Sequence, residues 1–298
     1  MSTSRKYEYT FFKGYQKNDK LRVSFNELAE KTFPISFEVW YKAGYWNEKY
    51  IPYTLFDGNK AIANISVNIM DFNVFGERKR YIQLGTVMTD ENYRNKGLSR
   101  HLMEKVLQDW NSKCDFIYLY ANSTVLNFYP KLGFTPVKEY EFFKSVKKSG
   151  PSTFVKLNMD EQSNRDKLHD YAKNTKSIGE LSMQENADLV LFYCITVFKD
   201  GVYYSELLDV IVVAMFNNDQ LHLLDVYSKK DASLNDIIDS LCDDKSKTVL
   251  LGFTPKNCSS FEIRQINEEL KADVLFVQND KSSLFDENKL MFPLLSHA

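Results

Sequence analysis

Twice along this 298-residue chain, apolar residues predict the same order of elements: a β-hairpin, a helix, a strand, a helix and a strand. The first run extends from Tyr53 to Phe143 and the second from Leu207 to Val277. Strand periods of two residues alternating with helical periods of 3.6 predict an α/β (α+β) chain, in which helices flank sheets. Alternation of this kind also arises without duplication, so the repeat permits two related halves but does not require them.

The first run is preceded by apolar residues at helical spacing, interrupted by Pro34 and closed by Gly44. Downstream, Leu98, Leu102 and Val106 share one helical face. The expected strands are 53–56, 61–70, 81–88, 115–120 and 134–143, and the expected helices are 21–33, 36–43, 98–110 and 124–132.

Lys, Ser, Gly and Pro over 144–151 indicate a linker, and the charged stretch 160–175 predicts a solvated helix. In the second run the expected strands are 207–216, 221–227, 248–253 and 274–277, and the expected helices are 233–242, with Ser233 as N-cap, and 260–270. We therefore expect a first domain over 1–145, a linker with a helix over 146–177 and a second domain over 178–298.

Composition excludes several classes of partner. The formal charge is −2 and the pI is near 6.2, so no overall basic field favours nucleic acid or anionic lipid. The four cysteines are far apart and the four histidines scattered, which predicts reduced thiols and no metal site. No apolar stretch reaches the roughly 18 residues that span a bilayer, and the polar N-terminus lacks a signal h-region. We expect a cytoplasmic protein without a membrane partner.

The stretch Gln83 to Leu102 has the strongest chemical content, because a strand runs into a polar loop at the start of a helix. Backbone N–H groups at a helix N-terminus attract anions, and Gly97 would let a phosphate approach the backbone. Arg94, Lys96 and Arg100 add positive charge. The alternative is an ordinary helix start with solvated basic residues. Neither GxxxxGK[ST] nor GxGxxG is present, which disfavours nucleotide hydrolysis and dinucleotide redox chemistry.

Arg94-x-x-Gly97-x-Ser99 resembles the R/Q-x-x-G-x-G/A pyrophosphate loop of the GNAT superfamily of N-acetyltransferases. About 30 residues later, the segment from Asn127 to Phe134 (NFYPKLGF) resembles that superfamily's second motif. The resemblance covers residues 5–143. It departs at Ser99, where the family usually has Gly or Ala. It departs also at Gln83, which cannot replace the glutamate base of many members.

The resemblance implies a GNAT fold, with a mixed, mostly antiparallel central sheet flanked by helices. It implies transfer of an acetyl group from acetyl-CoA to a primary amine by direct attack. The segment 178–298 would be a degenerate GNAT-like α/β domain, because its corresponding turn from Ser228 to Ala232 has no glycine. We predict that this second domain binds no CoA and instead shapes the acceptor cleft.

The resemblance also assigns roles. Backbone N–H groups of the loop would hold the pyrophosphate, the N–H of Val87 or Met88 would stabilise the carbonyl oxygen, and two asparagines would contact the pantetheine arm. The implied cofactor-binding residues are Val87, Met88, Thr89, Arg94, Asn95, Lys96, Gly97, Leu98, Ser99, Arg100, Asn122 and Asn127.

Tyr129 is the implied general acid for the departing thiolate; the alternative is a core aromatic. The second GNAT-like half and the apolar tail 290–298 resemble the "enhanced intracellular survival" branch, without its sterol-carrier-like domain. In that branch the terminal carboxylate is the base, which here would be that of Ala298. We expect the tail to be docked, and the alternative for Ala298 is a purely structural tail.

Glu38, Trp40, Tyr41 and Trp46 cluster where this family borders its acceptor, so they could form a pocket for a cationic amine. Packing of the helix onto the sheet is the alternative. The expected partner is a small-molecule or peptide amine, and a homo-oligomer stays open. The rival function is a catalytically silent CoA-binding or ligand-sensing module.

Overall fold

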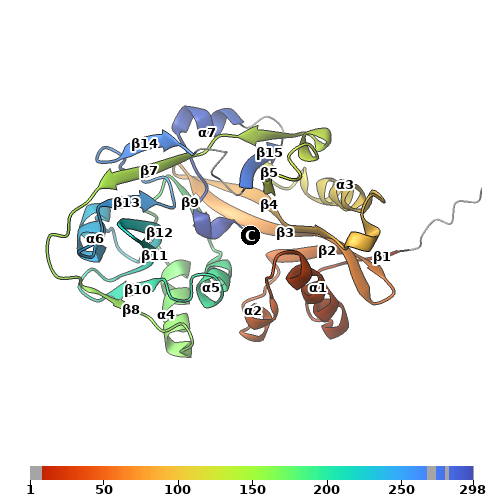
Figure 1. Cartoon of the computed structure of the whole chain (residues 1–298), viewed down its shortest axis with the longest axis horizontal. Helices are drawn as coiled ribbons and strands as arrows, with labels where there is room; N and C mark the ends of the chain where they lie inside the picture. Colours follow the sequence, from red (N-terminus) through yellow and green to blue (C-terminus); the bar gives the residue numbers. More distant parts are fainter. Residues whose placement is uncertain (1–8, 267–272, 279–281, 298) are drawn as a thin grey trace, which may run out of the picture. The chain divides into compact units, whose positions relative to one another are not determined.

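The computed structural model describes residues 9–266, 273–278 and 282–297 (Figure 1). The chain divides into two compact units, and each unit is assembled from segments that are not consecutive in the sequence. In its described residues, unit 1 comprises 9–69 and 82–114, and unit 2 comprises 70–81 and everything after 114. No helix within the described ranges is long and apolar enough to cross a membrane. All four cysteines are free thiols.

Unit 1 carries an antiparallel β-meander and three α-helices. Its elements are β1 (Thr10–Lys13), α1 (Asp19–Thr32), α2 (Glu38–Lys42), β2 (Tyr50–Asp57), most of β3 (Lys60–Val74) and of β4 (Glu77–Thr89), η1 (Glu91–Tyr93) and α3 (Leu98–Trp110). β2 pairs antiparallel with both β1 and β3. The expected helices at 21–33 and 98–110 are confirmed, and the buried Leu98, Leu102 and Val106 form the apolar stripe of α3.

Unit 2 contains a group of strands in which distant parts of the sequence pair. Its elements here are β5 (Phe116–Asn122), η2 (Tyr129–Leu132), β6 (Phe134–Val137), β9 (Leu181–Gln184) and β15 (Asp273–Gln278). β15 lies antiparallel between β5 and β6, with Val277 opposite Tyr118 on one side and Thr135 on the other. Strand β15, which belongs to the expected second domain, thus pairs with β5 and β6 of the expected first domain. The boundaries 1–145, 146–177 and 178–298 stay predictions.

The other sheet of unit 2 has the strand order β14-β7-β13-β12-β11-β10-β8. Only β12 and β13 pair in parallel, so the sheet is mixed and mostly antiparallel. Apolar side chains of α6, including Ile237 and Ile238, pack in the core of this sheet. Figure 1 shows helix α6 beside the strands of this sheet. The elements are β7 (Tyr140–Ser145), β8 (Phe154–Lys156), α4 (Gln162–Lys173), α5 (Ala187–Ile195), β10 (Val202–Ser205), β11 (Val210–Asn217), β12 (Gln220–Ser228), α6 (Leu234–Leu241), β13 (Thr248–Leu251), β14 (Glu262–Gln265), α7 (Ser282–Asn288) and η3 (Leu294–Ser296).

Two expected helices are corrected. The described part of 260–270 contains β14, whose residues pair antiparallel with β7, because partners far along the chain decide between helix and strand for so short a segment. Over 124–132 only η2 is helical, and Pro130 lacks the N–H that a longer helix would need. Helix α5 was not predicted from the sequence. Seven of its nine residues are buried, so its apolar residues do not mark one face of a helix.

Candidate active site

The loop between β4 and α3 has the backbone geometry of an anion site. Asn95 and Gly97 have positive φ angles of 62° and 75°, and Gly97 is the N-cap residue of α3. No side chain caps this helix, and its first turn has no acidic residue. A Cβ added at Gly97 would meet no described atom within 4 Å, so the Cα of Gly97 faces open space. These features match those that hold phosphates at helix N-termini.

The basic side chains of the loop lie at the protein surface. Arg94, Lys96 and Arg100 are exposed, and Arg100 forms an i,i+4 ion pair with Glu104 at 3.2 Å. The hydroxyls of Thr89 and Ser99 lie 2.8 Å apart, which ties the end of β4 to the first turn of α3. Ser99, where the family has Gly or Ala, therefore has a partner within the protein.

The start of the loop is held by a buried carboxylate. Asp90 is 4% exposed, and its N–H donates to the carbonyl of Ile62 at 2.9 Å. Its carboxylate pairs with Lys60 at 2.8 Å and accepts the N–H of Asn92 at 3.0 Å. Burial raises the pKa of Asp90, but the ion pair and hydrogen bonds outweigh it and lower the pKa below its usual value. Asp90 stays ionised near neutral pH and fixes the loop.

Strand β4 is irregular one residue before the predicted Val87–Thr89 segment. Thr86 has a φ of 48°, which is a rare conformation for a β-branched residue. Its carbonyl accepts Nδ2 of Asn64 at 2.9 Å, and its hydroxyl lies 2.7 Å from that of Tyr50. Sequence reasoning missed Thr86 and Asn64; a glycine inside a strand pattern, here Gly85, is the signal that marks such a site.

Asn64 is the centre of a buried polar chain that crosses three strands. Its Oδ1 accepts the hydroxyl of Thr54 at 2.7 Å, and its Nδ2 also donates to Ser66 at 2.9 Å. The hydroxyl of Thr54 is in turn 2.5 Å from that of Tyr15. Asn64, Thr54 and Ser66 are all fully buried, so the hydrogen bonds that satisfy them also hold Thr86 in its conformation.

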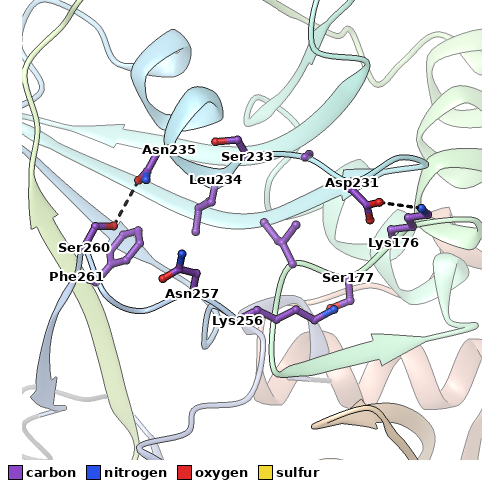
Figure 2. A pocket seen from close by; sticks show the side chains of 12 residues that line it. Lys176, Ser177, Asp231, Ser233, Leu234, Asn235, Lys256, Asn257, Ser260 and Phe261 are labelled. Atoms are coloured by element: carbon purple, nitrogen blue, oxygen red, sulfur yellow. Dashed lines mark hydrogen bonds and ion pairs between the residues drawn. The ribbon is translucent and has the colours of Figure 1, made fainter.

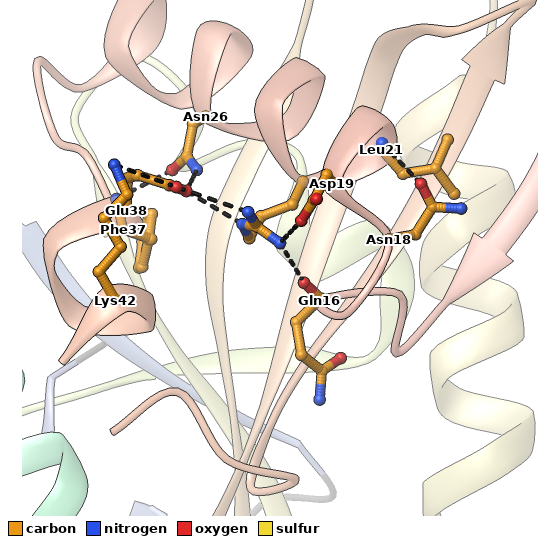
Figure 3. A network of polar contacts seen from close by, with 9 residues as sticks. Gln16, Asn18, Asp19, Leu21, Asn26, Phe37, Glu38 and Lys42 are labelled. Carbon is orange, nitrogen blue, oxygen red and sulfur yellow. Dashed lines mark hydrogen bonds and ion pairs between the residues drawn. The ribbon is translucent and has the colours of Figure 1, made fainter. Parts of the chain in front are cut away.

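The predicted acceptor residues lie in a packed cluster. Trp40 and Trp46 are 2% and 6% exposed, with their rings stacked at 5.8 Å. Glu38 accepts from Arg22 at 3.0 Å and pairs with Lys42 at 3.6 Å, and Figure 3 shows it also joined to Asn26. This geometry favours the packing alternative for the tryptophans, and their contact with an acceptor stays a prediction.

Tyr41 belongs to the same cluster. The guanidinium of Arg22 lies 3.7 Å from its ring centroid, so the cation on that face is the protein's own. The Arg22–Glu38 pair joins α1 to α2. The acidic side chain of this cluster is therefore already paired within the protein.

Tyr129 lies in unit 2, where Gly133, with a φ of 84°, ends the η2 turn. The ring is 3% exposed and contacts the rings of Phe128, Phe134 and Phe276. Its hydroxyl makes no hydrogen bond within the described part of the chain. Burial raises the pKa of Tyr129 to about 12. The phenol therefore keeps its proton near neutral pH.

The two asparagines predicted to contact pantetheine are exposed residues of unit 2. Asn122 is the last residue of β5. Its side-chain oxygen accepts two hydrogen bonds from Thr124, one from the N–H at 3.0 Å and one from the hydroxyl at 2.5 Å. The amide nitrogen of Asn122 remains a donor, because a single carboxamide oxygen takes both bonds. Asn127 is two residues before Tyr129 in sequence.

The tail after α7 is docked in unit 2, which confirms that expectation for its described residues. Leu290, Phe292 and Leu295 are fully buried. Phe292 stacks on Tyr118 at 4.1 Å, and His297 stacks on Tyr120 of β5 at 3.9 Å. Ala298 lies outside the described residues, so its role as a base stays a prediction.

Comparisons with known proteins point in one direction. Residues 17–137 match the model of an acetyltransferase (GNAT) domain. No curated protein matches the sequence. A probable N-acyltransferase from Enterococcus faecalis has a similar fold, with 13% identity, 94% of this chain and 75% of that chain covered, and a TM-score of 0.54.

Two further solved structures have similar folds. A GCN5-related N-acetyltransferase from Kribbella flavida is 13% identical, with 92% of this chain and 72% of that chain covered and a TM-score of 0.55. Eis1 from Mycobacterium abscessus is 11% identical, with 90% and 72% covered and a TM-score of 0.54. At these identities the likeness concerns the fold, and it extends over both expected halves.

Proposed function

We propose that this chain, whose residues 17–137 match the model of a GNAT acetyltransferase domain, transfers an acetyl group from acetyl-CoA to a primary amine. The observation that carries the proposal is the loop between β4 and α3. Its uncapped helix start, the left-handed Gly97 and the open space before it are the features that a pyrophosphate requires.

The residues of unit 1 fit the cofactor as follows. N–H groups from Asn95 to Arg100 bind the pyrophosphate, and Arg94 and Lys96 add charge-assisted contacts. Bound acetyl-CoA supplies the acetyl group as a thioester. The irregularity at Thr86 interrupts the strand just before Val87 and Met88, whose backbone N–H groups stabilise the carbonyl oxygen as it gains charge.

Tyr129 moves the proton at sulfur. The amine nitrogen forms a bond to the carbonyl carbon, the C–S bond breaks, and the phenol of Tyr129 donates its proton to the departing thiolate. One feature supports this role: the hydroxyl of Tyr129 makes no hydrogen bond to the described part of the chain, so it is available as a donor. The attacking amine is neutral, and the proton that its nitrogen releases as the amide forms passes through water and restores the phenol of Tyr129, so the products are the acetamide and the CoA thiol.

Amine-dependent release of free CoA thiol tests the proposal, with polyamines, aminoglycosides and lysine peptides as acceptors. Tyr129→Phe should lower kcat by about a hundredfold while acetyl-CoA affinity changes little, because a general acid contributes roughly 10²–10⁴-fold. Tyr193→Phe is the matched control, since Tyr193 is also a buried tyrosine of unit 2. Acetyl-CoA binding without turnover on any acceptor would leave the silent CoA-binding module instead.

A further inference from the structure

A pocket of about 310 Å³ opens in unit 2 beside the turn that joins β12 to α6 (Figure 2). Its lining comes from three short segments, around Ser177, Leu234 and Asn257. The volume is at the low end of the range for small-molecule sites. None of the lining residues is used in the proposed acetyl transfer.

The pocket wall is fixed by backbone contacts. Gly179 and Pro255 form a β-bridge, and the N–H of Lys256 donates to the carbonyl of Ile178 at 2.9 Å. A Cβ added at Gly179 would lie 3.2 Å from the carbonyl oxygen of Thr254, so glycine permits this close approach. A ligand entering a preformed wall loses less free energy to ordering the protein.

The floor of the pocket is apolar. Ile178, Leu234 and Phe261 are half-buried and pack against the hydrophobic core of the second sheet. Figure 2 shows Leu234 and Phe261 turned toward the pocket, with Asn257 between them. Each side chain keeps an apolar face that a ligand could cover, and Phe261 adds an aromatic ring for stacking.

The charge of the lining is positive. Asp231, the one carboxylate among the lining residues, pairs with Lys176 at 3.2 Å. Lys256 forms no ion pair with any residue that the structure describes. The Oδ1 of Asn257 accepts the N–H and hydroxyl of Ser259 at 3.2 and 2.7 Å, which leaves its Nδ2 as a donor. The pocket therefore offers an uncompensated cation, an amide donor and an apolar floor.

We propose that this pocket binds a small organic carboxylate with an aromatic or aliphatic body. The carboxylate contacts Lys256 and Asn257, and the body covers Leu234 and Phe261. A cationic ligand is disfavoured, because the carboxylate that would receive it is already paired. A bare inorganic anion would leave the apolar floor uncovered. The proposal does not depend on acetyl transfer, so either can fail alone.

The test is a ¹⁹F NMR titration of the full chain with 4-fluorophenylacetate, in the absence of acetyl-CoA. We expect saturable binding that weakens at least tenfold with 4-fluorophenylacetamide, which keeps the ring and loses the charge. Lys256→Met should also weaken binding about tenfold, because a charge-assisted hydrogen bond is worth roughly 1.5–3 kcal/mol. The control Lys245→Met removes another exposed lysine of unit 2 and should leave the affinity unchanged.

Four results would overturn the proposal. They are equal affinity for the amide, unchanged affinity in Lys256→Met, displacement of the probe by inorganic phosphate as readily as by phenylacetate, and loss of binding in Arg94→Met, which would move the ligand to the loop before α3. Acetate should compete at least tenfold more weakly than phenylacetate, since it lacks the body that covers Phe261. Both lysines are exposed, so their variants should fold, and circular dichroism checks that they do.

Discussion

Two segments of the molecule run from a strand through a turn into a helix, and they satisfy the helix start in opposite ways. Between β4 and α3, Asn95 and Gly97 take left-handed conformations and no side chain caps the helix. Between β12 and α6, the hydroxyl of Ser233 accepts the N–H of Asp236 at 3.3 Å. A helix that satisfies its own N–H groups has fewer to offer a phosphate.

The basic residues of the two turns also differ in their partners. Lys230 pairs with Asp209 at 2.9 Å, and Lys229 pairs with Asp170, so the second turn's charges are met by the protein. In the first turn, the side chain of Arg94 donates to the carbonyl of Thr89 at 3.5 Å and forms no ion pair within 4 Å with any residue that the structure describes. We infer that the proposed anion site depends on the uncapped N–H groups of α3 and on Arg94, rather than on the number of basic residues in the turn.

The ends of the strands beside these turns also matter. Gly252, just after β13, donates its N–H to Leu223 of β12 at 2.8 Å, and its carbonyl accepts the N–H of Leu294 in the tail at 2.9 Å. A Cβ at Gly252 would lie 2.7 Å from the carbonyl oxygen of Leu224. The chain's own tail thus occupies the end of this strand pair, which supports the prediction that the second half binds no CoA.

The largest expected effect concerns the buried side chains that hydrogen-bond the irregular parts of strands β4 and β12. In β4, Thr86 is held by the neutral amide of Asn64. In β12, where the pairing with β11 shifts register, Asp225 accepts the hydroxyl of Tyr227 at 2.8 Å and the N–H of Val226. Burial raises the pKa of Asp225 to about 6. The carboxyl group of Asp225 therefore changes its charge with pH, whereas the amide of Asn64 does not.

The sign of this pH dependence follows from the folded pKa of Asp225 exceeding its unfolded value of about 3.9. Its contribution to stability is full below that value and is lost as pH rises through about 6. Asp225→Asn should thus gain stability relative to the parent as pH rises from about 4 to 7, by up to about 3 kcal/mol, and the difference should be constant above that. Urea unfolding across this range measures it. A pH-independent difference between the two proteins would show that Asp225 is not the titrating support.

The second-largest expected effect comes from replacing Gly97 in the loop between β4 and α3. Gly97→Ala should weaken acetyl-CoA binding by about a hundredfold, because the new Cβ projects into the open space that the phosphates would enter. The strain of a left-handed alanine costs about 1 kcal/mol of stability. Gly76→Ala is the matched control, since Gly76 has a φ of 89° and the same open surroundings. It should lose the same stability and keep its affinity. Equal affinity losses would trace the effect to strain alone.

The sequence predicted the elements whose signals are local. Gly97 and the cap at Ser233 are identified from the sequence because a tight turn or an N-cap restricts the residue type. The place of β15 between β5 and β6 could not be predicted, since nothing in an apolar strand names its partner. Partners that are distant in sequence could not be predicted for the site either. Arg22 and Glu38 are separated by 16 positions along the chain, and Asn64 and Thr86 by 22 positions.

The smallest expected effect tests the cap of the second segment. Ser233→Ala should lower the free energy of unfolding by about 1 kcal/mol, because the N–H of Asp236 loses its acceptor. Ser233→Gly should cost only a few tenths of a kcal/mol, since glycine lets water reach the same groups. Neither change should alter acetyl-CoA affinity, which calorimetry can measure beside urea unfolding. If Ser233→Ala left stability unchanged, the hydroxyl would not satisfy the helix, and the contrast between the two turns would depend on Asn95 and Gly97 alone.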